Sequence, residues 1–314
     1  MLEFILLICG LAGLWVGAEI LINAAISLAA RYKVSDALIG MLILAIGTDI
    51  PELLVAVDAS LGSLAGVDLS GIVIGTAIGS SIGQFGLVIG VVGFFGLSRR
   101  PLELALGNAA FLSGGLLLLA VFFFDGLVSS REGWALVLLY CAYLFTVLYR
   151  KKAYAEQDND APKEHLLKTL FFLVLGLTLL PLAAQLTVIS ATDFAETIGL
   201  SNLSVSAILI GLGSSLPELS VAIIAMLKNR SALSIGNLMG SNVLDTLLVP
   251  GVAATISPIV VPTTALLFDL PVLALMTALV IGFLYVSPRG VKKTEASILL
   301  LIYVTYAFVR MVAD

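Results

Sequence analysis

Long apolar runs, separated by short polar or glycine-containing segments, repeat along the whole chain. A helix that spans a bilayer needs about 20 mainly apolar residues, and we count ten runs of suitable length. The predicted spans cover 2–30, 36–62, 70–97, 102–124, 133–150, 166–192, 203–227, 232–257, 263–286 and 294–312. The pattern therefore predicts an all-α polytopic membrane protein with ten transmembrane helices.

Composition supports this prediction. The 314 residues are 60% hydrophobic and 12% charged, and the mean hydropathy is +1.13. Because a soluble domain carries about 25% charged residues, this chain lacks the polar residues for a water-facing surface. The first run has neither a basic start nor a small-residue cleavage site, so we expect a retained helix rather than a signal peptide.

The basic residues predict an orientation. If the N-terminus lies outside and every span crosses once, all Lys and Arg residues except Arg131 and Arg310 fall in inside loops. Basic residues concentrate in cytoplasmic loops of membrane proteins. The sequence therefore predicts an even number of spans, with both termini outside.

The two halves of the chain resemble each other. GMLILAIGTDIPELLVAV from Gly40 matches SAILIGLGSSLPELSVAI from Ser206, and IGTAIGSSIGQ from Ile74 matches IGNLMGSNVLD from Ile235. Each half holds five predicted spans, so the second copy enters the membrane from the opposite side. Such inverted repeats are typical of secondary transporters, whose sites lie near the midplane.

We therefore expect one membrane domain built from two inverted five-helix repeats. A polar segment too short for a regulatory domain separates them and is expected to be cytoplasmic. The predicted boundaries are 1–150 for the first repeat, 151–165 for the linker and 166–314 for the second repeat.

Four carboxylates lie well inside predicted spans: Asp49, Glu52, Glu218 and Asp245. An ionised side chain at the bilayer centre costs at least about 2.5–3.5 kcal/mol. Protonation or a buried Lys or Arg would explain them structurally, but no basic residue lies in the middle of a predicted span. Neutralisation by a bound cation, a proton or both is therefore the favoured interpretation.

Two prolines predict how further ligands become available. Pro51 and Pro217 each remove a backbone donor and disturb the preceding turn, which predicts available carbonyls near 45–48 and 211–214. An all-oxygen set with several carboxylates suits Ca²⁺ better than soft metals. The hydroxyls and amides expected to complete the set are Thr48, Ser214, Ser215, Ser80, Ser241, Gln84 and Asn242.

Other residue types indicate packing or surface roles. Small residues spaced four apart predict close helix contacts, here between the third and eighth spans and the second and seventh. The glycines concerned are Gly71, Gly75, Gly79, Gly83, Gly236 and Gly240. Cys9, Cys141 and a single His165 provide neither a disulfide framework nor an imidazole metal site. We expect no enzyme activity and no cofactor.

The repeated blocks resemble the two α-repeats of the calcium:cation antiporter superfamily, in its sodium/calcium exchanger branch. The family motif is close to GTSLPE in each half, followed by GN-x-x-GSN. Here the motifs read GTDIPE at 47–52 and GSSLPE at 213–218, then GTAIGSSIGQ at 75–84 and GNLMGSNVLD at 236–245. The resemblance covers both repeats and agrees with the ten-span inverted layout.

This resemblance implies roles for individual residues. It makes Glu52 and Glu218 the central Ca²⁺ ligands and Asp245 the acidic ligand of the second half. It implies that the first and sixth helices slide across the bundle to give alternating access. Backbone or hydroxyl oxygens are implied for Ala45, Thr48, Gly211 and Ser214, and flanking Na⁺-type positions for Ser80, Ser215 and Ser241.

Two residues depart from the family pattern. Asp49 stands where Ser is usual, and Gln84 stands where Asn is usual. Close like charges raise one another's pKa, so a fourth carboxylate can hold or move a proton. The proton/calcium branch carries a Glu after GN, whereas this chain has Thr76. Na⁺ is therefore favoured as the coupling ion, with H⁺ as the alternative.

The sequence thus predicts a secondary antiporter that exchanges Ca²⁺, or another divalent cation such as Mg²⁺ or Mn²⁺, for Na⁺. A passive channel is less favoured because selectivity rings usually come from symmetric subunits. An aspartyl enzyme using Asp49 and Asp245 leaves the two glutamates unexplained. We expect a monomer in a prokaryotic cell membrane, whose partners are the lipid bilayer and inorganic cations and not nucleic acid.

Three further acids lie outside the repeated ligand set. Glu19 aligns with Gln185, and the sequence leaves open whether it lines the ion passage or bonds between helices. Asp58 lies off the face of Glu52, which predicts an outer vestibule or span-end position. Asp269 is expected close to the interface.

Overall fold

Helices form nearly all of the described chain, which comprises residues 2–95, 102–149, 165–197, 213, 215–286 and 290–313 of a computed structural model. The first half contains α1 (Leu2–Tyr32), α2 (Asp36–Ile39), η1 (Gly40–Leu44), α3 (Ala45–Thr48), α4 (Ile50–Leu64), α5 (Ser70–Gly83), η2 (Gln84–Val88), α6 (Ile89–Gly93), α7 (Leu102–Phe123), β1 (Leu127–Val128) and α8 (Ser130–Tyr149). The second half contains α9 (Leu166–Thr197), α11 (Leu216–Leu227), α12 (Ser231–Val243), η4 (Leu244–Leu248), α13 (Val249–Ile256), β2 (Ile259–Val260), η5 (Ala265–Asp269), α14 (Leu270–Val286) and α15 (Lys293–Ala313). The all-α membrane architecture is therefore confirmed.

The helix bounds agree with the predicted spans wherever the chain is described. Within the described residues, seven helices are long and apolar enough to cross a membrane, and an eighth is the bent pair Asp36–Thr48 and Ile50–Leu64. Two shorter apolar helices, Asn108–Phe123 and Leu216–Leu227, adjoin positions outside this description. The count of ten spans stays a prediction.

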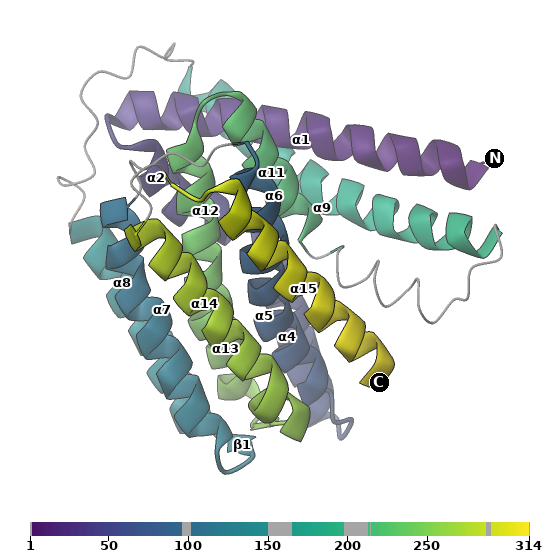
Figure 1. The fold of residues 1–314 in the computed structure, drawn as a ribbon, viewed down its shortest axis with the longest axis vertical. Coiled ribbons are helices and arrows are strands. Elements are labelled where there is room, and N and C mark those ends of the chain that lie inside the picture. Colours follow the sequence, from purple (N-terminus) through teal and green to yellow (C-terminus); the bar gives the residue numbers. More distant parts are fainter. Residues whose placement is uncertain are drawn as a thin grey trace.

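The two longest helices, α1 and α9, lie side by side and cross one end of a bundle formed by the other helices (Figure 1). Glycines bring them together, because a Cβ on Gly10 or Gly13 would overlap Thr187 or Ala183. A Cβ on Gly176 of α9 would lie 2.8 Å from the Cβ of Leu21. The α1–α9 pair is thus one closely packed unit.

Three loops predicted to lie outside meet at one end of the bundle. β1 pairs antiparallel with β2, and the Val260 N–H donates to Ser70 Oγ at 2.9 Å. Beside them, the Ser70 N–H donates to Asp68 Oδ1 at 3.0 Å and holds the pKa of this exposed carboxyl below its usual range. This grouping is the one the predicted topology requires.

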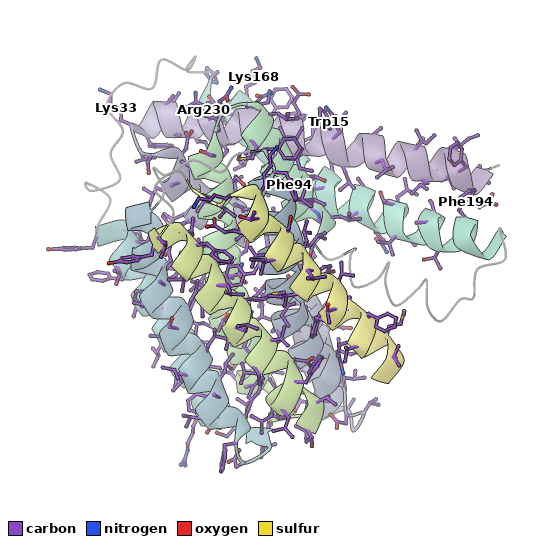
Figure 2. The ribbon with its side chains drawn as sticks, in the orientation of Figure 1. Trp15, Lys33, Phe94, Lys168, Phe194 and Arg230 are labelled. Atoms are coloured by element: carbon purple, nitrogen blue, oxygen red, sulfur yellow. The ribbon has the colours of Figure 1, made fainter. Side chains whose placement is uncertain are left out.

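Basic side chains from predicted inside segments gather at the other end. Lys33, Lys168 and Arg230 all lie at this end of the molecule in Figure 2. Arg230 Nη1 lies 3.2 Å from Oδ2 of Asp36, whose side chain is only 3% exposed. The orientation in the bilayer, including both termini outside, stays a prediction.

Glycine packing follows the expected arrangement where the contacting segments are described. Gly236 and Gly240 of α12 pack against the second span, since a Cβ on Gly236 would overlap the Ala37 carbonyl oxygen and one on Gly240 would lie 2.8 Å from the Met41 carbonyl oxygen. Gly83 meets Ser215 in the same way. No described atom lies within 4 Å of a Cβ built on three others: Gly71, Gly75 and Gly79. The start of the seventh predicted span, near 203–211, lies outside the described residues. Whether these three glycines pack against it is therefore untested.

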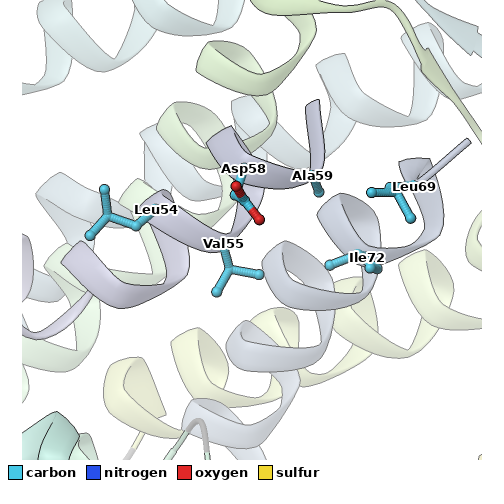
Figure 3. Close-up of a pocket in the computed structure, with 6 residues that line it drawn as sticks. All are labelled: Leu54, Val55, Asp58, Ala59, Leu69 and Ile72. Atoms are coloured by element: carbon cyan, nitrogen blue, oxygen red, sulfur yellow. The ribbon is translucent and has the colours of Figure 1, made fainter. Parts of the chain in front are cut away.

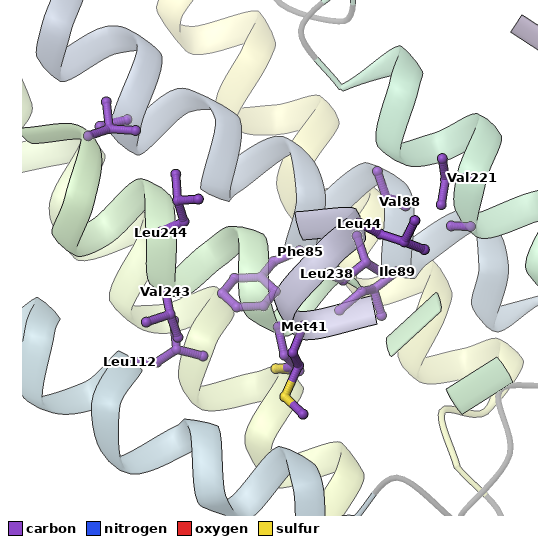
Figure 4. Packing of buried hydrophobic residues seen from close by; sticks show 14 of the residues in the cluster. Met41, Leu44, Phe85, Val88, Ile89, Leu112, Val221, Leu238, Val243 and Leu244 are labelled. Carbon is purple, nitrogen blue, oxygen red and sulfur yellow. The ribbon is translucent and has the colours of Figure 1, made fainter. Parts of the chain in front are cut away.

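An apolar core surrounds the centre of the bundle. Met41, Leu44, Phe85 and Val88 are each at most 1% exposed and pack together with Leu238 of α12 (Figure 4). This packing brings the irregular segments η1 and η2 against α12. Polar groups on these segments are therefore held in a water-poor interior.

Candidate cation site

The second span breaks at Asp49. The helix pair on either side of it is bent by 42°, and Asp49 itself has φ −92° and ψ 2°. Pro51 has no N–H, so the Gly47 carbonyl loses the donor of an uninterrupted helix. The Ala45 carbonyl, by contrast, accepts from the Asp49 N–H at 3.1 Å and from Thr48 Oγ1 at 3.5 Å. The break predicted from proline is present, but it does not leave Ala45 unpaired.

The second repeat has the same backbone geometry at the matching position. Ser215 has φ −94° and ψ 0°, and Pro217 occupies the first turn of α11. The Leu219 N–H donates to the Ser215 carbonyl at 2.9 Å, as the Leu53 N–H does to Asp49 at 3.0 Å. Thus the two motifs build equivalent helix starts. Two expected ligands of this half, Gly211 and Ser214, lie outside the described residues.

A hydrogen-bond network joins α5 to α12. Gln84 Nε2 donates to Ser80 Oγ at 3.2 Å and to Asp245 Oδ2 at 3.1 Å. Asn242 Nδ2 donates to Gln84 Oε1 at 2.8 Å and to the Leu238 carbonyl at 2.8 Å. Gln84 begins η2 and Asp245 lies in η4, so the wider turns of π-helix fall at matching places in both halves. Such turns are frequent at functional sites.

The four predicted carboxylates are brought into one electrostatic cluster. Asp49 lies beside the Ser241 hydroxyl and the Glu218 carboxyl. Asp245 is subject to the charges of Asp49, Glu52 and Glu218. All four side chains are buried, with Glu52 the most exposed at 6%. None of them forms an ion pair with a described Lys or Arg.

Several oxygens in this cluster have no hydrogen-bond partner among the described residues. They are Asp49 Oδ2, Glu52 Oε2, Glu218 Oε1 and Oε2, Asp245 Oδ1, Ser215 Oγ and Ser241 Oγ. Carboxylate and hydroxyl oxygens of this kind are ligands for hard cations such as Ca²⁺.

The carboxylates alone do not form a ready coordination group. No three His, Cys, Asp or Glu side chains within the described ranges are arranged to hold one metal ion together. Hydroxyl, amide and backbone oxygens therefore have to supply part of any coordination. Thr48, Ser80 and Ser241 are buried at this place and can do so.

The three remaining acids lie away from this cluster. Glu19 pairs with Lys228 at 3.1 Å, which is a contact between helices. Asp269 is buried, accepts from Tyr306 Oη at 3.1 Å and lies 3.5 Å from Nε of Arg310. Asp58 is exposed and lines a cavity of about 300 Å³ between α4 and α5, together with Leu54, Val55, Ala59, Leu69 and Ile72 (Figure 3).

Sequence reasoning missed two buried polar residues on α12. Asn237 and Ser234 are completely buried, although neither carries a charge that would have drawn attention. The available signals were the place of Asn237 in the GNLMGSNVLD motif and the spacing of the two residues. Asn237 and Ser234 lie four and seven residues before Ser241, which places all three on one side of a helix.

Comparisons with known proteins show the family and agree with the overall fold. The family model described as sodium/calcium exchanger protein matches residues 2–149 and 168–312. The sodium/calcium exchanger MaX1 of Methanosarcina acetivorans is 26% identical, with 98% of each chain covered. The inner membrane protein YrbG of Escherichia coli is 31% identical over 81% of this chain and 79% of its own. A structure of the sodium-calcium exchanger NCX_Mj superposes with a TM-score of 0.81 at 27% identity, covering 97% of both chains.

Proposed function

Since the chain belongs to the sodium/calcium exchanger family, we propose that it exchanges Ca²⁺, or a related divalent cation, for Na⁺ by alternating access at the buried carboxylate cluster. Members of this family are ion exchangers and not enzymes, and the chain is a multi-pass membrane protein. The observation that carries the proposal is the cluster of Asp49, Glu52, Glu218 and Asp245 without a basic partner among the described residues.

Charge explains why such a site exchanges ions instead of leaking them. Several ionised carboxylates in a water-poor interior are strongly unfavourable unless cations neutralise them. The protein therefore converts readily between its outward-facing and inward-facing states only when cations occupy the site. One divalent cation or several Na⁺ ions can each provide that neutralisation, and their alternation at one site couples the two fluxes.

Contacts of α9 support alternating access. A Cβ on Gly47 would touch Leu177 of α9, and one on Gly213 would touch Val188 of the same helix. Leu177 and Val188 are eleven residues apart, or about 16 Å along a helix. Thus α9 covers both helix breaks at once. Sliding of the α1–α9 unit would uncover them in turn.

Transport by purified protein tests the proposal. Proteoliposomes loaded with Na⁺ and diluted into Na⁺-free buffer should take up Ca²⁺, and the Glu52→Gln and Glu218→Gln variants should not. Matched vesicles without a Na⁺ gradient measure leakage. Ca²⁺ flux that persists without any exchangeable counter-ion would favour a channel, and normal transport by both variants would contradict the proposal.

Proton coupling is the second candidate, because Asp49 adds a fourth carboxylate beside Glu218. In the Asp49→Ser variant, which has the residue usual in the family, Na⁺-driven Ca²⁺ uptake should persist. Any uptake driven by a pH gradient should disappear. If wild-type uptake responds only to the pH gradient, H⁺ replaces Na⁺ as the coupling ion.

A further inference from the structure

Buried polar atoms continue along α12 beyond the carboxylate cluster. Ser234, Asn237 and Ser241 lie at positions i, i+3 and i+7, and all three are 0% exposed. Neither Nδ2 nor Oδ1 of Asn237, nor Oγ of Ser234, has a hydrogen-bond partner among the described residues. A buried polar group that is left unpaired destabilises the folded protein. A core built only for packing would place apolar side chains here.

The side chains of Ser241, Asn237 and Ser234 lie along α12 between the carboxylate cluster and one end of the molecule. Asp245 and Ser234 are eleven residues apart, which is about 16 Å along a helix and about half of a 30 Å hydrocarbon core. At that end Arg230, next to the first residue of α12, pairs with Asp36. This is the end where Lys33 and Lys168 also lie, and which the sequence predicts to be cytoplasmic.

The first repeat has different residues at the positions that match Ser234 and Asn237. At the matching offset of 161 residues, α5 has Val73 opposite Ser234 and Thr76 opposite Asn237. Val73 is apolar, so the Ser234 hydroxyl has no counterpart in the first repeat. In this structure the second span closes over α12, because a Cβ on Gly40 would lie 2.7 Å from the Asn237 backbone nitrogen.

We infer that Ser234 and Asn237 form a further cation-binding position, which holds a partly hydrated Ca²⁺ or Na⁺ between the carboxylate cluster and the cytoplasmic side. This inference rests on the proposed function. One hydroxyl and one amide oxygen provide ligands without charge, so binding there is weak and an ion can leave. A conduction path needs sites of this kind, where binding allows both entry and release.

Cysteine labelling tests the path directly. Asn237→Cys would be made in a Cys9→Ser, Cys141→Ser background, since both native cysteines are exposed. A membrane-impermeant cationic methanethiosulfonate should react with it during turnover from the same side as Lys228→Cys, and from the side opposite to Asp68→Cys. These markers make the test independent of the predicted orientation. No reaction, or reaction from the Asp68 side only, overturns the inference.

Sided kinetics provide the second measurement. Asn237→Leu, which keeps the branching and the number of side-chain heavy atoms, should raise the half-saturating Ca²⁺ concentration on the Lys228 side by about fivefold. The value on the Asp68 side should stay unchanged, and Thr76→Val should leave the Lys228-side value unchanged. If Asn237→Leu changed the half-saturating Ca²⁺ concentration equally on both sides, or on neither, the role of Asn237 would be structural and the inference would be overturned. Absence of exchange by the wild-type protein would instead refute the proposed function.

Discussion

Gln84 forms hydrogen bonds that join the two halves of the chain. Its amide donates to Asp245 and accepts from Asn242, so both partners lose a hydrogen bond if it is removed. Gln84→Ala should lower the free energy of unfolding by about 1–2 kcal/mol. Thermal unfolding in detergent without Ca²⁺ measures this change.

A suitable control is Ser60→Ala on α4. The Ser60 hydroxyl is buried and has no partner among the described residues, so its removal should not destabilise the protein. Equal stability of the Gln84→Ala and Ser60→Ala proteins would mean that the network contributes nothing.

At the level of elements, the ion pair between Asp36 and Arg230 fastens α2 to the start of α12. Arg230→Ala should destabilise the protein by about 3 kcal/mol, because it leaves a buried carboxylate without its counter-charge. Lys228→Ala should cost less than about 1 kcal/mol, since its partner Glu19 is 48% exposed. Unfolding temperatures of both variants provide the comparison.

The double variant Asp36→Asn, Arg230→Gln separates charge from packing. It should recover much of the stability lost in Arg230→Ala, because no unpaired charge remains. A double variant as unstable as Arg230→Ala would assign the loss to the packing of the arginine side chain instead.

The close approach of α1 and α9 depends on glycine. A Cβ on Gly176 would lie 3.0 Å from both N and Cα of Leu21, and backbone atoms cannot move aside as a side chain can. Gly176→Ala should therefore destabilise the protein by about 1–3 kcal/mol. Gly114→Ala on α7 is the matched control, because no described atom lies within 4 Å of a Cβ built on Gly114 and alanine favours a helix. Similar unfolding temperatures for the two variants would argue against tight α1–α9 packing.

At the level of the whole molecule, much of the architecture follows from the sequence because membrane spans are limited by length and polarity. The helix breaks at Asp49 and Ser215 were predicted from Pro51 and Pro217, and the breaks have matching backbone angles. The carboxylate cluster was predictable because charge is costly inside a bilayer.

Other features depend on distant contacts that spacing alone does not define. The pairing of Asp36 with Arg230 joins residues 194 positions apart. The Ala45 carbonyl was expected to be available, but it accepts from the Asp49 N–H. A proline deprives the carbonyl four residues before it of a donor, and for Pro51 that carbonyl belongs to Gly47. Asn237 lies in the GNLMGSNVLD motif but carries no charge, and only the structure shows that it is buried without a partner among the described residues.

Alternating access makes a prediction for the whole molecule, because it requires the α1–α9 unit to move against the rest of the bundle. A Cβ on Gly13 would lie 3.0 Å from the Cβ of Ala183, whereas one on Gly47 would meet the side chain of Leu177. A short bifunctional thiol reagent joining Gly13→Cys to Ala183→Cys should leave exchange intact. Joining Gly47→Cys to Leu177→Cys should stop it. Both pairs would be made without the native cysteines and compared before and after cross-linking. Exchange that continues with α9 tied to the helix break would show that access alternates by another movement.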